Sequence, residues 1–385
     1  MPDFHKLISR AGAAVMAVCL LTRGIFAEDI CPRVSAESAI VIEASGGNVI
    51  FEKDADTRRP MASTTKIMTA LVALEAGDTS REVSVSSGAV GLEGLTVGIE
   101  GSSVYLETGD RLSLDDLVWA LMLESANDAA AAIAINVAGS VDAFAELMNA
   151  KAKEIGLENT HFTNPHGLDN EEHYTTARDL ALLAAHALSN PRFREIVSTY
   201  RHNITVGDET RYLLNHNKML RLYDGAIGVK TGYTKRSGRC LVSAAERSGV
   251  TLVAVTLNAP DDWRDHTAML DFGFTKYESR ELIRPGESVF IQPCIGCERH
   301  TVSIRNTDGL TVCVPTTVGE VRRIVELPRY LWAPVAEGQM VGKIRFVADD
   351  GSGNEITLGE VALYSDEDAP RISYEKKGLL GRLFG

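Results

Sequence analysis

The alternation of hydrophobic and polar positions in the first part of the chain predicts two strands followed by a buried helix. Apolar residues dominate 38–43 and 48–52, and the Ala-Ser-Gly-Gly sequence at 44–47 is typical of a turn between strands. A helix is expected over 63–75, because a proline precedes it and a glycine follows it. Its interior is apolar on almost every side, as in a buried helix. Further helical patterns cover 114–123, 128–138, 142–155 and 176–188.

The pattern changes after residue 224, where strands become frequent. Strands are predicted over 225–230, 240–246 and 251–258, and a helix over 261–272 follows them. Strands at both ends of this region and helices in its middle predict one antiparallel sheet, whose edge strands come from both ends and which helices cover. This arrangement belongs to the α+β class.

From about residue 280 the chain consists of short strands and turns. The predicted strands cover 288–292, 300–305, 310–314, 342–347 and 359–364. They predict a second, smaller all-β domain. The expected division is a leader over 1–27, an α+β domain over 28–278, a β-rich domain over 279–370 and a short basic amphipathic tail over 371–385.

The first 27 residues have the pattern of a secretory signal peptide. Lys6 and Arg10 form a basic start, residues 11–21 are apolar, and residues 25–27 end in a small residue that suits cleavage. The apolar run is too short for a permanent span of the bilayer. We therefore expect an exported protein, in the periplasm or peripheral at the outer face of the cytoplasmic membrane. An uncleaved N-terminal anchor is the alternative.

Composition and charge narrow the class of protein. The 385 residues are 45% hydrophobic and 24% charged, as in an ordinary globular protein. The formal net charge of −13 argues against nucleic-acid binding, which needs a basic surface to displace counterions. The tail over 371–385 departs from this acidic balance, because basic residues alternate there with leucine and phenylalanine. It is either a frayed end or a short helix that lies on an anionic membrane.

The leader contains one of the six cysteines, and its removal leaves five: Cys31, Cys240, Cys294, Cys297 and Cys313. An exported protein can keep disulfides, but an odd number leaves at least one thiol unpaired or paired between chains. Three of these cysteines, with His300, also offer a four-ligand set for zinc: Cys294, Cys297 and Cys313. A disulfide or small buried thiols in strands are favoured over zinc, and the pairing stays open.

Three short motifs follow one another in the α+β domain: Ser63-Thr64-Thr65-Lys66, Ser125-Ala126-Asn127 and Lys230-Thr231-Gly232. The first two patterns recur by chance at 373–376 and 352–354, so neither is specific alone. The order, spacing and placement of the set are specific. This combination is typical of penicillin-binding proteins and class A β-lactamases.

The first motif places a nucleophile beside a base. A spacing of three brings Ser63 and Lys66 to one helix face, with Ser63 at the helix start, where free N–H groups favour a developing anion. A serine hydroxyl is a poor nucleophile unless a neighbour takes its proton. Lys66 can take it if burial or a second cation, Lys230, lowers its pKa. The alternatives are a helix cap for Ser63 and a solvated side chain for Lys66.

The second motif lies between two predicted helices. There Ser125 can pass a proton to a leaving amine, while the amide of Asn127 holds the substrate backbone. Capping of the next helix is the alternative for both residues.

The third motif lies on a predicted strand. Lys230 can attract a terminal carboxylate, and the hydroxyls of Thr231 and Thr234 can hydrogen-bond to it. Gly232 allows the strand to approach the substrate closely. The backbone N–H groups of Ser63 and of a residue near Thr234 would form an oxyanion hole.

With these motifs the chain resembles the low-molecular-mass penicillin-binding proteins that act as D-alanyl-D-alanine carboxypeptidases. The resemblance covers about 34–364 and includes the flanking sequences at 61–69, 164–168, 173–177 and 228–234. It implies a β-lactamase/transpeptidase-like catalytic domain, a β-rich domain and often a C-terminal membrane-surface helix. It also implies peptidoglycan peptide stems as substrates, β-lactams as inhibitors, and no metal or organic cofactor.

By the same resemblance, Ser63 is the acyl-enzyme nucleophile and Lys66 its proton acceptor, and Ser125, Asn127 and Lys230 complete the site. His216 stands where some relatives have arginine, which puts one substrate contact in doubt. The glutamate motif with which class A β-lactamases deacylate is absent, so penicillin is expected to inhibit. A D,D-endopeptidase and a non-catalytic wall-binding scaffold remain the alternatives.

Overall fold

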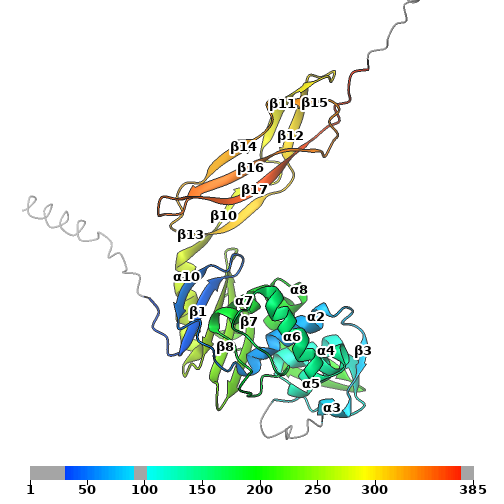
Figure 1. Cartoon of the computed structure of the whole chain (residues 1–385), viewed down its shortest axis with the longest axis vertical. Helices are drawn as coiled ribbons and strands as arrows, with labels where there is room; N and C mark the ends of the chain where they lie inside the picture. The colour runs from blue at the N-terminus through cyan, green and yellow to red at the C-terminus, as the bar shows by residue number, and fades with distance from the viewer. Residues whose placement is uncertain (1–30, 91–101, 374–385) are drawn as a thin grey trace, which may run out of the picture. The chain divides into compact units, whose positions relative to one another are not determined.

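The computed structural model describes residues 31–90 and 102–373 (Figure 1). The expected signal peptide lies outside these residues, as does nearly all of the expected tail.

A five-stranded antiparallel sheet has the order β2-β1-β9-β8-β7. Its edges follow the prediction, since β1 and β2 come from one end of the domain and the other three strands from the opposite end. The strands are β1 (Ser38–Glu43), β2 (Val49–Lys53), β7 (Ala226–Thr234), β8 (Gly238–Arg247) and β9 (Val250–Leu257).

Both faces of this sheet are buried. Every residue of β1 is buried, and alternate side chains enter different cores, because successive side chains of a strand point to opposite faces. Ile40 and Ile42 belong to the main helical core. Ala39 and Val41 pack instead in a second core with side chains of α10 (Asp262–Lys276). A strand that is buried along its whole length therefore lies between two packed layers.

Helices cover the main face of the sheet. The expected helix over 63–75 begins differently, because residues Ala62–Thr65 form a 3-10 turn, η1, and only Lys66–Glu75 is α-helical (α2). The first eight residues of α2 are buried, as its apolar pattern predicted. The other helices of this layer are α4 (Leu114–Leu123), α5 (Asn127–Ala138), α6 (Val141–Ile155), α7 (Ala177–Leu188) and α8 (Pro191–Ser198).

Short elements near the helices escaped prediction because they are either only three or four residues long or largely polar. They are β3 (Glu82–Ser84), α3 (Ser87–Val90), β4 (Arg111–Ser113), β5 (Arg201–Val206), β6 (Glu209–Leu214) and α9 (Met219–Leu222). Antiparallel pairs join β3 to β4 and β5 to β6.

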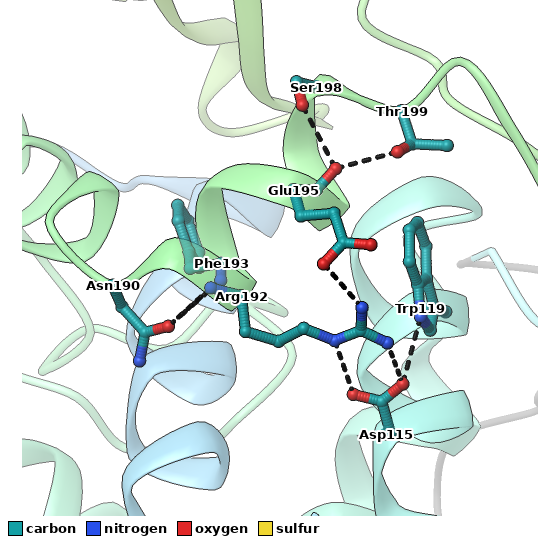
Figure 2. A network of polar contacts seen from close by, with 8 residues as sticks. All are labelled: Asp115, Trp119, Asn190, Arg192, Phe193, Glu195, Ser198 and Thr199. Atoms are coloured by element: carbon teal, nitrogen blue, oxygen red, sulfur yellow. Dashed lines mark hydrogen bonds and ion pairs between the residues drawn. The ribbon is translucent and has the colours of Figure 1, made fainter.

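One guanidinium fixes α8 against α4 (Figure 2). Arg192 Nε donates to Asp115 Oδ1 at 2.9 Å, and Arg192 Nη1 donates to Glu195 at 2.6 Å. The Asp115 carboxylate also accepts the indole N–H of Trp119 at 3.1 Å, and the guanidinium lies over the Trp119 ring. Hydrogen bonds to Asp115 and then to Glu195 raise the pKa of Arg192. The network anchors the start of α4, the helix that ends two residues before Ser125.

The β-rich domain follows α10. Its six-stranded sheet has the order β14-β16-β17-β12-β11-β15, and β10 (Tyr277–Ile283) pairs separately with β13 (Leu310–Pro315). Its core includes Val302, Ile304, Phe346 and Leu363. The sequence missed β10, β14 and β15. The sheet strands are β11 (Val289–Ile295), β12 (Thr301–Asn306), β14 (Arg322–Glu326), β15 (Leu331–Trp332), β16 (Met340–Asp349) and β17 (Glu355–Ser365).

In the part of the chain that the structure describes, no single helix is both long enough and apolar enough to cross a bilayer. The pair α5 and α6, bent by 83°, passes that test together by length and composition. Both helices contribute buried side chains to the main core.

Candidate active site

Ser63 lies in η1, the turn that contacts β7 and leads into α2. The preceding residue, Ala62, has φ +48°, a conformation that costs free energy for a residue with a side chain. Close backbone contacts hold this turn. A Cβ at Gly167, which has φ +87°, would lie 1.9 Å from the Ala62 carbonyl oxygen, and a Cβ at Gly232 would lie 3.0 Å from the Ser63 nitrogen. Gly232 was expected to let the strand approach the substrate, and in the structure it also lets the strand approach Ser63.

Lys66 is fully buried, one turn after Ser63. Its Nζ lies 2.9 Å from Ser63 Oγ, 2.7 Å from Asn127 Oδ1 and 2.7 Å from the carbonyl oxygen of His166. Burial, and then the charge of Lys230, lower the pKa of Lys66 well below its ordinary value. The solvated alternative for Lys66 is wrong, and both predicted causes of a neutral amine are present.

The second motif turns sharply between α4 and α5. Ser125 has φ +61° and is buried, although it lines the cleft. Asn127 is the first residue of α5, and the N-cap is Ala126, which makes no side-chain cap. The capping alternative for Asn127 is therefore wrong, because its amide oxygen accepts from Lys66 instead.

Lys230 is only 2% exposed, on β7. Its Nζ donates to the carbonyl oxygen of Thr231 at 3.1 Å. Burial lowers the pKa of Lys230 to about 7, although the nearby Glu124 carboxylate opposes this shift. Thr231 faces the cleft. The Thr234 hydroxyl also lies there, but Asp169 Oδ1 and Ser237 Oγ engage it at 3.0 Å each.

These groups surround a single cleft with a volume of about 530 Å³. All eight predicted site residues lie in it or directly behind it. Six line the cleft, and the two lysines are buried in its wall: Ser63, Ser125, Asn127, Thr231, Gly232 and Thr234, with Lys66 and Lys230 behind.

The sequence missed a histidine that supports the nucleophile turn. His173 Nδ1 accepts the Thr163 N–H at 3.0 Å, so the ring proton is on Nε2, which donates to Thr65 Oγ1 at 2.7 Å. The Thr65 hydroxyl in turn donates to the Ala62 carbonyl at 2.8 Å. Burial lowers the pKa of His173 to about 4, so the ring is neutral. The flank at 173–177 was the only signal for this role.

Basic and aromatic residues that the motifs did not indicate line another part of the cleft. They are Lys218, Tyr233, Arg239 and Trp263. His216 also faces the cleft, and its Nε2 lies 3.2 Å from the carboxylate of Glu124. Burial and Lys230 lower the pKa of His216.

Cys240 lies on β8 opposite Gly232. Its thiol is buried and points to the carbonyl oxygen of Pro60, with 3.8 Å between sulfur and oxygen. Burial raises the pKa of the Cys240 thiol to about 11, and the side chain forms part of the cleft wall.

The four ligands of the zinc alternative do not converge. Cys294 and Cys297 adjoin one another, but Cys313 pairs with Ser279 in the β10–β13 sheet. Among residues 31–90 and 102–373, no group of three or more histidine, cysteine, aspartate or glutamate side chains is arranged to hold a metal ion.

A serine beside a buried amine, a Ser-x-Asn turn and a Lys-Thr-Gly strand at one cleft define a penicillin-binding serine hydrolase. Comparison with known proteins gives the family. Residues 27–261 match the family described as D-alanyl-D-alanine carboxypeptidase, and residues 277–371 match the C-terminal domain of penicillin-binding protein 5. The chain belongs to the D-alanyl-D-alanine carboxypeptidase family, and it is a hydrolase of that type.

Individual relatives agree with this assignment. D-alanyl-D-alanine carboxypeptidase DacC of Escherichia coli is 30% identical over 90% of this chain and 89% of its own. DacF of Bacillus subtilis is 29% identical over 88% and 87%. The crystal structure of penicillin-binding protein 5 from Haemophilus influenzae is 28% identical, covers 88% of this chain and 99% of its own, and has a TM-score of 0.65. The fold is therefore the expected catalytic domain followed by a β-rich domain.

Proposed function

We propose that this carboxypeptidase removes the terminal D-alanine of peptidoglycan pentapeptides through an acyl-enzyme on Ser63. The observation that carries the proposal is the set of three contacts at Lys66. A neutral amine has two N–H donors and one lone pair. Asn127 Oδ1 and the His166 carbonyl can only accept, so they take the two N–H groups. The lone pair is left for the Ser63 hydroxyl, 2.9 Å away.

In the first half of the reaction, Lys66 takes the Ser63 proton while Oγ attacks the carbonyl carbon of the penultimate D-alanine. The backbone N–H of Ser63 and one on β7 near Thr234 stabilise the tetrahedral oxyanion. The C–N bond then breaks. The proton on Lys66 passes through the Ser125 hydroxyl to the leaving amine, and free D-alanine departs.

In the second half, water attacks the acyl-enzyme. Lys66 is neutral again, so it takes a proton from the water, and Ser63 recovers its own when the ester breaks.

Before acylation, the protonated amine of Lys230 attracts the carboxylate of the terminal D-alanine, and the Thr231 hydroxyl donates a hydrogen bond to it. Asn127 holds the substrate amide while it keeps Lys66 oriented.

The test is release of free D-alanine from a peptide that ends in D-Ala-D-Ala, by the wild type and by Ser63→Ala. Release by the wild type alone supports the proposal. Equal release by both proteins contradicts the role of Ser63. Cleavage confined to cross-linked dimers would assign D,D-endopeptidase activity instead. Labelling by a fluorescent penicillin adds an independent readout, because β-lactams acylate the same serine in this family.

We further propose that the protein is exported and acts in cell wall biogenesis and cell shape at the outer face of the cytoplasmic membrane. The basic, apolar and small-residue sequence at 1–27 supports cleavage and export. The basic and apolar residues of 371–385 support peripheral contact with an anionic membrane. The N-terminal mass of the secreted protein tests the first proposal. Loss of vesicle binding on deletion of 371–385 tests the second.

A further inference from the structure

Two cysteines in the β-rich domain take no part in the chemistry of the cleft. Cys294 lies in β11, and Cys297 lies in the turn that leads to β12. The residues are 3% and 1% exposed, so neither thiol is a surface group. Both are free thiols in the structure.

The two side chains adjoin one another. Cys297 Sγ lies 3.4 Å from the backbone oxygen of Cys294, and the Cys297 thiol is close enough to help raise the pKa of the Cys294 thiol. Gly296 between them has φ +83°, the left-handed conformation that lets the chain reverse within so few residues. The turn therefore holds the two sulfur atoms within reach of each other.

We propose that Cys294 and Cys297 form a structural disulfide in the exported protein. Each thiol loses a proton, and the two electrons reduce a disulfide oxidant, a small molecule or a protein, to two thiols. One thiolate attacks the oxidant and forms a mixed disulfide. The second thiolate then attacks the mixed disulfide, which forms the internal S–S bond and releases the oxidant in its reduced form.

The surroundings favour a structural bond over a catalytic one. Redox-active cysteines are accessible and have a lowered pKa. Here burial, with the neighbouring thiol, raises the pKa of Cys294 to about 11. Burial of both sulfurs also implies that the bond forms before the domain closes and afterwards resists reductants. Export to an oxidising compartment supplies the setting, so the proposal rests on the proposed localisation and not on the chemistry of Ser63.

The bond would stabilise a point where three chain segments meet. The carbonyl oxygen of Ile295 accepts the N–H of Ala333, at 2.9 Å, just after β15. The carbonyl oxygen of Gly296 accepts the N–H of Ile372, at 2.8 Å, near the end of the described chain. The backbone of Cys297 forms an isolated antiparallel β-bridge with that of Arg371. Because the closed loop is so short, it removes little entropy from the unfolded chain, and the main effect is on this local junction.

The experiment refolds the full, reduced chain in a buffer of oxidised and reduced glutathione. The protein is then unfolded in an alkylating reagent, without reductant, and digested for mass spectrometry. We expect the peptide with Cys294 and Cys297 to carry no alkyl group and to be two hydrogen atoms lighter. After reduction it should carry two groups. Cys240 and Cys313 should be alkylated in both samples.

Matched variants identify the cysteines that form the bond. Cys313→Ser should keep the wild-type pattern, whereas Cys294→Ser/Cys297→Ser should lose the reductant-dependent difference. In the wild type only, prior reduction should speed amide exchange at Ala333 and Ile372 about tenfold, because those hydrogen bonds open locally. Alkylation of both cysteines without reduction would overturn the proposal, as would pairing with Cys31 or Cys313. So would bound zinc that protects both thiols.

The refolding arm does not depend on export, and D-alanine release by the refolded protein, measured before it is unfolded, reports Ser63 separately. A protein that lacks the disulfide but releases D-alanine contradicts this inference alone. A protein that forms the disulfide but releases no D-alanine contradicts the proposed reaction alone.

Discussion

The imidazole of His173 donates a hydrogen bond from Nε2 to the hydroxyl of Thr65, at 2.7 Å, within the turn that carries Ser63. Thr65 then donates to the carbonyl of Ala62, the residue with φ +48°. A neutral side chain from a segment more than a hundred residues away therefore helps to hold the strained turn. Positioning of the nucleophile is a property of packing as much as of its own motif.

His173→Gln should lower the rate of acylation about tenfold, because a small displacement of Ser63 slows attack while the reactive groups remain. The measurement is the rate of penicillin labelling against drug concentration. A structural role acting through Ser63 predicts a lower maximum rate with a little-changed half-saturating concentration. An unchanged maximum rate would show that Thr65 holds the turn alone.

Lys66→Met should reduce acylation about 10²–10⁴-fold, the usual contribution of a general base. Lys66 is the buried amine whose lone pair meets the Ser63 hydroxyl, and methionine has a similar shape without the base. Labelling by penicillin and release of D-alanine should fall together. Lys153→Met, at an exposed position of α6, is the control and should leave both rates unchanged.

The pH dependence of kcat/KM should report Lys230. Its pKa of about 7 in the free enzyme means that the ammonium loses its proton as the pH rises through 7. The attraction for the substrate carboxylate then disappears, so kcat/KM should fall on the alkaline side while kcat changes less. Lys230→Arg, which stays charged, should move this fall to much higher pH. An alkaline limb that is unchanged in the arginine variant would assign the titration to another group.

Stability should decrease as the pH falls from about 6.5 to 4. The buried rings of His166, His173 and His266 have pKa values lowered to about 3, 4 and 3, mainly by burial. In the unfolded chain they take up protons near pH 6.5, so the unfolded state binds more protons over this interval and is favoured as pH falls. At pH 5, each histidine should lower the free energy of unfolding by on the order of 1–2 kcal/mol relative to its value at neutral pH.

Thermal unfolding between pH 7 and pH 4 measures this effect. His173→Gln should make the melting temperature less dependent on pH. His186→Gln, on the exposed side of α7, should not. Equal slopes in all three proteins would contradict the proposed linkage.

Gly167→Ala should abolish labelling by penicillin, whereas Gly156→Ala should not. The two glycines have nearly equal φ, +87° and +86°, so both substitutions place alanine at a positive φ. Only at Gly167 would the new methyl group meet the Ala62 carbonyl; nothing lies within 4 Å at Gly156. A difference in activity between folded variants isolates the close contact. Equal activity would show that the Ser63 turn tolerates displacement.

The sequence predicted most of the layered domain because its strands and helices are long and periodic. In β1, the apolar run over residues 39–42 leaves no polar face, so burial on both sides of the sheet follows from the pattern. The pairs β3–β4 and β5–β6 were not predicted, since β3 and β4 have only three residues each, and β5 and β6 together bury only three side chains.

The motifs likewise predicted that the eight expected residues form one site. They did not predict the contacts that hold these residues in place. The start of α2 was placed correctly near Ser63, yet the 3-10 turn and the conformation of Ala62 depend on contacts with Gly167 and Gly232. Similarly, Asn127 has the sequence features of a cap, and only the position of Lys66 in space shows what its amide oxygen binds. Local propensity does not contain such long-range contacts.

Cys240, which lies on β8 opposite Gly232 of β7, allows local opening of this enzyme to be measured with its natural thiol. Its thiol is 1% exposed and belongs to the wall of the cleft, so a thiol reagent reaches it only when that wall opens locally. The rate of modification in the native protein would then measure how often the active-site strand opens, with no label introduced by mutation. Slower modification after acylation of Ser63 would mean that an acyl group in the same cleft covers or steadies this part of the wall.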